Sequence, residues 1–240
     1  MAREKIQTGR VLNSDKLSGM GGIDIMNTQK RQPAIILVDT SGSMRGNEEL
    51  LQNSVVRLYE EIMCNPVASN AVELGIMEFN DYIHVLVEPK EVYKQEDMGR
   101  SLVFKCAGQT LTGLAVKEAI ARLEKRIQEI KKAGIPHYSP ILFLLSDGEP
   151  YCSIDEVEQE NKAALIESIK KIENMVQKNK LRVVCVEVGL GCNHELMKKL
   201  TGISDEPNAR VMNISSAGEL ADFFKWTSSY LIQSATGVIN

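Results

Sequence analysis

Two short, uninterrupted apolar runs, Ala34–Val38 and Ile141–Leu145, constrain the fold more than any other feature of this sequence. Continuous apolar runs of this length are typical of strands that are buried on both faces. Such strands occur in sheets with helices on both sides, because each face must be covered. We therefore predict that both runs are strands of a mostly parallel central sheet.

The segments between these runs carry the periodicity of helices and of further strands. Apolar residues recur at steps of three and four over 51–62, 116–130 and 165–176, which predicts helices with one buried face. Ser153 and Glu156 have the spacing of a capping box and are expected to start the third of these helices.

Alternating apolar residues at 72–76 and 83–87 flank Asn80-Asp81 and predict an antiparallel hairpin. Later strands are expected at Arg182–Val188 and near Arg210–Ile214. The pattern as a whole predicts an α/β fold: a doubly wound, mostly parallel central sheet with one antiparallel edge strand and helices on both faces.

The organisation expected for the 240 residues is one domain preceded by an arm. Residues 1–30 contain Gly19, Gly21 and Gly22 without a sustained hydrophobic period, so we expect an N-terminal arm or tail that the core does not need. Residues 31–240 are expected to form the folded domain.

Composition excludes several classes of partner and of location. Lys and Arg number 28 against 32 Asp and Glu, and aromatic residues make up 5% of the chain, so neither a basic surface nor a stacking platform for nucleic acid is expected. The apolar runs are far shorter than the roughly 20 residues of a membrane span. Residues 1–5 lack the apolar core of a secretory signal, and the five cysteines form no CxxC pair. We therefore predict a cytoplasmic protein with reduced thiols.

Polar side chains gather where the two buried runs end. Asp39 follows the first run, Ser41 and Ser43 extend the same turn, Asp147 follows the second run, and Thr110 precedes the second long helix. Ligands of open α/β sheets bind beyond the carboxyl ends of the strands. Two carboxylates and three hydroxyls are hard oxygen donors that suit Mg²⁺, with Mn²⁺ and Ca²⁺ as alternatives.

Each of these residues also has an ordinary structural explanation. Ser41 and Ser43 could cap the following helix, Asp39 could accept a hydrogen bond from a turn amide, and Asp147-Gly148 is a common turn dipeptide. The convergence of all of them on two strand ends favours a metal site over these separate explanations.

The order of these residues is similar to a known motif. Asp39-Thr40-Ser41-Gly42-Ser43, Thr110 and Asp147-Gly148 resemble the DxSxS…T…D metal-ion-dependent adhesion site of von Willebrand factor A (VWA) domains. The resemblance extends from about Pro33 to Leu231. Three segments, 38–46, 144–150 and 223–226, look like the bacterial TerY/YegL branch of that family.

The resemblance implies a function for the predicted site. Ser41 and Ser43 would coordinate the metal directly, Thr110 directly or through water, and Asp39 and Asp147 largely through water. One coordination position would stay open for an Asp or Glu supplied by another protein, such as a kinase or phosphatase of the same gene cluster. The implied function is metal-dependent protein binding in a bacterial stress-response system like that of tellurite resistance, without catalysis.

Two alternatives stay open. A metal-dependent phosphatase or other hydrolase could use Asp39 as its nucleophile, but the acid/base carboxylate of the DxD arrangement is replaced by Ser41. Glu149, two residues past Asp147, is an internal acid that could occupy the open metal position. The partner, the pathway, the oligomeric state and the metal used in the cell are not specified by the sequence.

Overall fold

The computed structural model describes residues 11–13, 26–95, 98–147, 149–189, 192–203 and 210–238. Within these ranges one seven-stranded sheet has the order β1-β4-β3-β2-β5-β6-β7. The strands are β1 (Val11–Asn13), β2 (Gln32–Asp39), β3 (Val72–Phe79), β4 (Ile83–Glu91), β5 (Ile141–Ser146), β6 (Arg182–Val188) and β7 (Val211–Ile214).

The sheet is mostly parallel and doubly wound, as predicted. Strand β2 lies at its centre and pairs in parallel with both β3 and β5, while β4 is antiparallel to β3. The one difference concerns the edge, because β1 pairs in parallel with β4 and lies outside it. The short strand β1 falls within the segment predicted to be an arm, whose dispensability stays a prediction.

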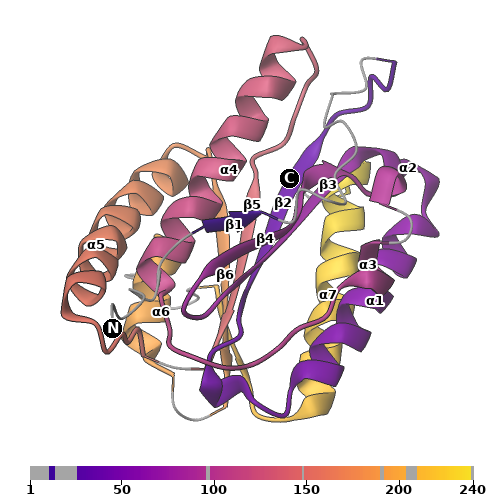
Figure 1. Ribbon diagram of the computed structural model, residues 1–240. Coiled ribbons are helices and arrows are strands. Elements are labelled where there is room, and N and C mark those ends of the chain that lie inside the picture. Colours follow the sequence, from indigo (N-terminus) through magenta and orange to yellow (C-terminus); the bar gives the residue numbers. More distant parts are fainter. Residues whose placement is uncertain are drawn as a thin grey trace, which may run out of the picture.

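Helices cover both faces of the sheet (Figure 1). The helices α4 (Thr112–Lys132), α5 (Asp155–Gln177) and α6 (His194–Thr201) lie on one face. The other face carries α1 (Glu48–Met63), α2 (Pro66–Ala71), α3 (Met98–Ser101) and α7 (Ala217–Thr236). Two 3-10 turns, η1 (Gly42–Met44) and η2 (Val92–Gln95), follow β2 and β4. Figure 1 thus shows three layers, with the sheet in the middle.

The central strands are buried on both faces because successive side chains enter different apolar layers. Ile36 contributes to the layer under α1 and α7, and its neighbour Ile35 to the layer under α4 and α5. Phe143 of β5 packs edge-on against Phe223 of α7, with ring centroids 6.3 Å apart. The sequences of β2 and β5 are therefore continuously apolar because both faces of each strand are buried, as predicted.

The start of α5 differs from the prediction. Its N-cap residue is Ile154, which makes no side-chain capping bond, so the capping box predicted at Ser153 and Glu156 is wrong. The backbone N–H of Ser153 instead donates to the side-chain oxygen of Gln109. A tertiary contact has replaced the local one.

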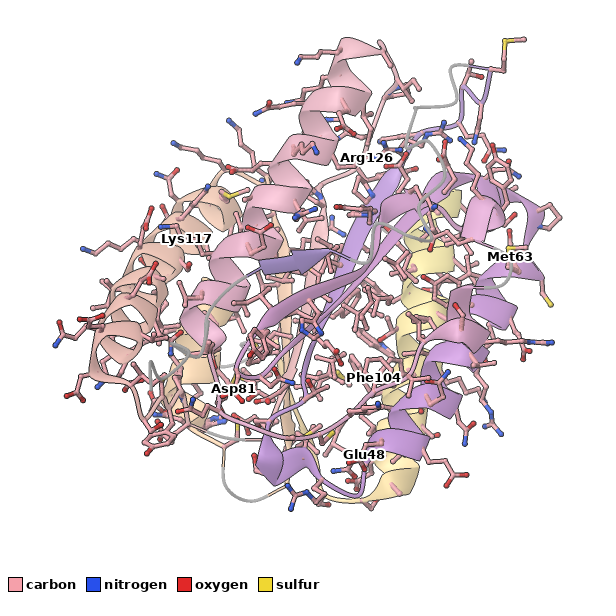
Figure 2. The ribbon with its side chains drawn as sticks, in the orientation of Figure 1. Glu48, Met63, Asp81, Phe104, Lys117 and Arg126 are labelled. Atoms are coloured by element: carbon pink, nitrogen blue, oxygen red, sulfur yellow. The ribbon has the colours of Figure 1, made fainter. Side chains whose placement is uncertain are left out.

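Four charged residues form a buried cluster at the end of the sheet where β2 begins. The Arg126 guanidinium donates two hydrogen bonds to Glu73, of 2.7 and 2.9 Å. Arg31 lies 3.3 Å from Glu73 and 3.1 Å from Glu91. Figure 2 shows Arg126 at this end, far from Asp81 at the other. Because Arg31, Glu73 and Glu91 are fully buried, each depends on its partners to offset the cost of desolvation.

We expect Glu73→Gln to destabilise the fold strongly. The substitution preserves shape but leaves two buried guanidinium groups with Glu91 as the one buried carboxylate and the half-exposed Glu129 beside Arg126. Breaking a buried ion pair costs about 3–5 kcal/mol. Urea unfolding measures the change. The matched control is Glu167→Gln, which removes an exposed pair with Lys117 and should have little effect; equal effects of the two substitutions would contradict the prediction.

Candidate functional site

The pairing of β2 with β5 brings the two predicted aspartates to one end of the sheet. Val38 lies opposite Leu145 in the register, so the residues that follow them share that end. Asp39 is fully buried. Its carboxylate accepts hydrogen bonds from the Ser41 N–H, at 2.8 Å, and from the Ser146 hydroxyl, at 2.6 Å. Hydrogen bonds therefore join both strand ends directly.

The two predicted serines continue this network to Asp147. The Ser41 and Ser43 hydroxyl oxygens are 3.0 Å apart, and the Ser43 hydroxyl donates to Asp147 at 2.8 Å. The 3-10 turn η1 positions them, since it begins immediately after Ser41. Ser41 is buried and Ser43 is exposed, so the network runs from the interior to the surface.

Thr110 lies on the adjacent loop, which leads into α4. The backbone of this loop is tied to the η1 turn by hydrogen bonds from Gly42 N–H to the Gly108 carbonyl and from Ala107 N–H to the Thr40 carbonyl, of 3.1 and 2.9 Å. Thr110 itself exchanges two backbone hydrogen bonds with Tyr151. The structure thus brings four predicted site residues into one hydrogen-bonded set and holds the loop of the fifth against it.

Burial sets the electrostatics of the site. Desolvation raises the pKa of Asp39 to about 6, and the hydrogen bonds from Ser146 and Ser41 only partly oppose it. Desolvation also raises the pKa of Asp147, against the opposing hydrogen bond from Ser43. Two carboxyl groups that resist ionisation side by side would be stabilised as carboxylates by a cation.

Two participants were not predicted from the sequence. Ser146 is the last residue of β5, and its polar side chain at the end of an apolar run was the available signal. Asp81, in the hairpin turn, accepts hydrogen bonds from the backbone and side chain of Gln109, beside Thr110. Nothing in the sequence pairs the hairpin turn with that loop, because the contact spans 28 positions.

The spacing of the oxygen atoms fits a small hard cation. In an octahedron of oxygens at about 2.0–2.1 Å from Mg²⁺, neighbouring ligands lie about 2.9 Å apart. The observed separations are 3.0 Å between the Ser41 and Ser43 hydroxyls and 2.8 Å between Ser43 and Asp147. These are hydrogen-bond distances, and a cation that replaced the shared protons could bind without moving the oxygens apart. Among the described residues, no three His, Cys, Asp or Glu side chains gather as a metal site of their own. A metal here would depend on hydroxyl ligands, which again fits a hard ion.

Comparison with known families identifies the class of protein. The model of the von Willebrand factor type A domain matches residues 35–226. The chain therefore belongs to the VWA family. The match spans every predicted site residue and all helices and strands from α1 to β7.

Solved structures share the fold at low sequence identity. Proximal thread matrix protein 1 from the mussel byssus, with a zinc-occupied MIDAS motif, is 16% identical with a TM-score of 0.58, covering 83% of this chain and 48% of that protein. The pilus adhesin SpaC from Lactobacillus rhamnosus GG is also 16% identical, with a TM-score of 0.61, covering 87% of this chain and 31% of the adhesin. The VWA-type domain of the Porphyromonas gingivalis pilus tip protein Mfa5 is 10% identical, with a TM-score of 0.55, covering 86% of this chain and 97% of that domain.

These similarities have a limited extent. The chain spans about half the length of the byssus protein and a third of the adhesin, and identities this low establish the fold alone. No match was found among curated proteins. Within the described ranges, no helix is both long enough and apolar enough to cross a membrane.

We expect burial of Asp39 to give the metal-free protein a characteristic pH dependence. Because the folded pKa of about 6 exceeds the ordinary value of 3.8, Asp39 contributes stability below pH 3.8 that is lost as the pH rises through 6. The loss relative to Asp39→Asn should approach about 3 kcal/mol. Urea unfolding in chelator from pH 4 to pH 7.5 measures it, and a pH-independent difference between the two proteins would contradict the assignment.

Proposed function

We propose that this chain is a metal-dependent protein-binding module. The metal, Mg²⁺ in the first instance, is held directly by Ser41 and Ser43, directly or through water by Thr110, and largely through water by Asp39 and Asp147. The observation that carries the proposal is the continuous hydrogen-bonded network from buried Asp39 through the two serines to Asp147, which gathers hard oxygen donors at one end of the sheet.

The protein's own residues prepare this site. Ser146 and the Ser41 N–H hold the Asp39 carboxylate in one orientation, as outer hydrogen bonds do for metal-binding carboxylates. Ser43 lies at the surface, where a partner can approach. When bound, the metal supplies a positive charge that attracts an Asp or Glu of the partner, and the partly buried surroundings strengthen that attraction.

The finer assignments rest on sequence motifs. Segments 38–46, 144–150 and 223–226 resemble the TerY/YegL branch, and we therefore propose a bacterial stress-response role with a kinase or phosphatase of the same gene cluster as partner. Cytoplasmic location is part of this proposal. The proteins of similar structure named above come from a pilus and from the byssus. The fold itself therefore does not favour a cytoplasmic location.

Burial of Asp39 disfavours the alternative of a hydrolase. A nucleophilic carboxylate must contact its substrate, whereas Asp39 is fully buried and both of its oxygens accept hydrogen bonds. We therefore propose binding without catalysis.

The metal site can be tested by calorimetry. Wild-type protein should bind Mg²⁺ and Mn²⁺ with measurable heat, and Asp39→Ala and Ser43→Ala should bind more weakly because each removes an oxygen from the network. Ser139→Ala is the matched control, since this residue precedes β5 at the opposite end of the sheet. Equal affinities in all four proteins would contradict the proposed ligands.

Partner binding should require the same site. In a pull-down from a bacterial lysate, we expect chelator, Ser43→Ala and mutation of the partner's acidic residue each to weaken binding. Their effects should not add, because all three break one linkage. Glu149 is exposed, and Glu149→Ala should leave affinity unchanged or raise it by removing a competing acid. A partner whose affinity is the same in chelator and in Mg²⁺ would show that binding occurs elsewhere.

A further inference from the structure

The residue before Thr110 is held by both its backbone and its side chain. One oxygen of Asp81, Oδ1, accepts hydrogen bonds from the Gln109 backbone N–H at 3.2 Å and from its side-chain Nε2 at 2.8 Å. The other end of the Gln109 amide accepts from the Ser153 backbone N–H. The Gln109 side chain therefore bridges the β3–β4 turn and the β5–α5 loop.

Gly108 shows how closely this loop lies against Asp81. Its backbone has a φ of +83°, and a Cβ at this position would lie 2.2 Å from Asp81 Oδ2. The positive φ favours glycine here, and a Cβ would have to displace the Asp81 carboxylate. The Gly108 carbonyl also accepts the hydrogen bond from Gly42 in the η1 turn, so the loop is packed between Asp81 and the proposed metal ligands.

The chain after Thr110 is fixed by other elements. The α4 helix has no N-cap side chain of its own, because its N-cap residue is Leu111. Buried Asn161 of α5 supplies the missing acceptor, and its side-chain oxygen receives hydrogen bonds from Gly113 and Leu114 N–H at 2.8 and 3.2 Å. Thr110 thus lies between two anchored segments, and its own backbone is paired with Tyr151 by two hydrogen bonds. Gln109 also holds the loop that contains Tyr151, because its side chain accepts from Ser153 N–H.

We propose that Gln109 is a positioning residue that holds Thr110 ready to bind the metal. This inference rests on the proposed function, because it assumes that Thr110 is a ligand. Without the Gln109 bridge, the Thr110–Tyr151 pair would lose its link to Asp81 and Ser153, and the remaining motion of the loop would have to be lost on metal binding, which would subtract from the binding free energy. Groups that hydrogen-bond directly to metal ligands typically account for about 10- to 100-fold in affinity, and Gln109, which acts one residue away from Thr110, is expected at the lower end of that range.

Asp81, which accepts the hydrogen bonds from Gln109, provides a matched pair of variants. Both hydrogen bonds from Gln109 go to Oδ1 of Asp81, and an asparagine retains an oxygen at that position. Asp81→Asn should therefore preserve the bridge, whereas Asp81→Ala should remove it. A role for Asp81 through its negative charge would instead make the two variants equally defective.

The experiment compares wild type, Gln109→Ala, Asp81→Ala and Asp81→Asn by calorimetry with Mn²⁺ and by urea unfolding in chelator. We expect Gln109→Ala and Asp81→Ala to bind Mn²⁺ about 10-fold more weakly and Asp81→Asn to bind like wild type. Loss of the hydrogen bonds should lower the unfolding midpoint in chelator to a small extent. The difference in midpoint from wild type should be larger when metal is added.

Three outcomes overturn the inference, and they can be told apart. Wild-type binding with unchanged affinity in Gln109→Ala would overturn the role of Gln109 while leaving the proposed function intact. A midpoint in chelator that falls as much as the midpoint in metal would make Gln109 a purely structural residue. Absence of Mn²⁺ binding by wild type would overturn the proposed function and this inference with it.

Discussion

The parallel pairing of β2 with β5 is the interaction on which the site depends. The two strands are buried on both faces, and their register fixes which residues emerge together at the carboxyl end. A slip of one residue would turn every side chain to the opposite face and would separate Asp39 from Ser146. The apolar layers above and below the sheet therefore stabilise the arrangement of the polar site as well as the fold.

The site itself has an electrostatic cost that the rest of the molecule offsets. Asp39 is buried with a raised pKa, and Asp147 nearby shares the same tendency. Hydrogen bonds from hydroxyls and one backbone N–H moderate this cost without removing it. Buried carboxyl groups with raised pKa values are typical of binding sites, where a positively charged ligand stabilises the ionised form.

Much of the fold and of the site could be predicted because the signals are local. The apolar runs ending at Asp39 and Asp147 specified two central strands, and the serine spacing marked the η1 turn. The positions of Asp81 and Gln109 could not be predicted, because their contact depends on how the hairpin packs beside another loop. The capping box at Ser153 was wrong for the same reason, since a tertiary partner took the hydrogen bond that a local rule assigned to the helix.

The buried cluster of Arg31, Glu73, Glu91 and Arg126 has a consequence for how this sequence can change over time. Any single replacement leaves an uncompensated charge in the interior, whereas replacement of the whole set by apolar residues of similar volume can be neutral or favourable. A series of single substitutions that converts the charged cluster into an apolar one passes through proteins of low stability. Single substitutions within the cluster should therefore be rare in evolution. The cluster does not constrain substitutions in the exposed loops around Ser43 and Tyr151, which do not contact it.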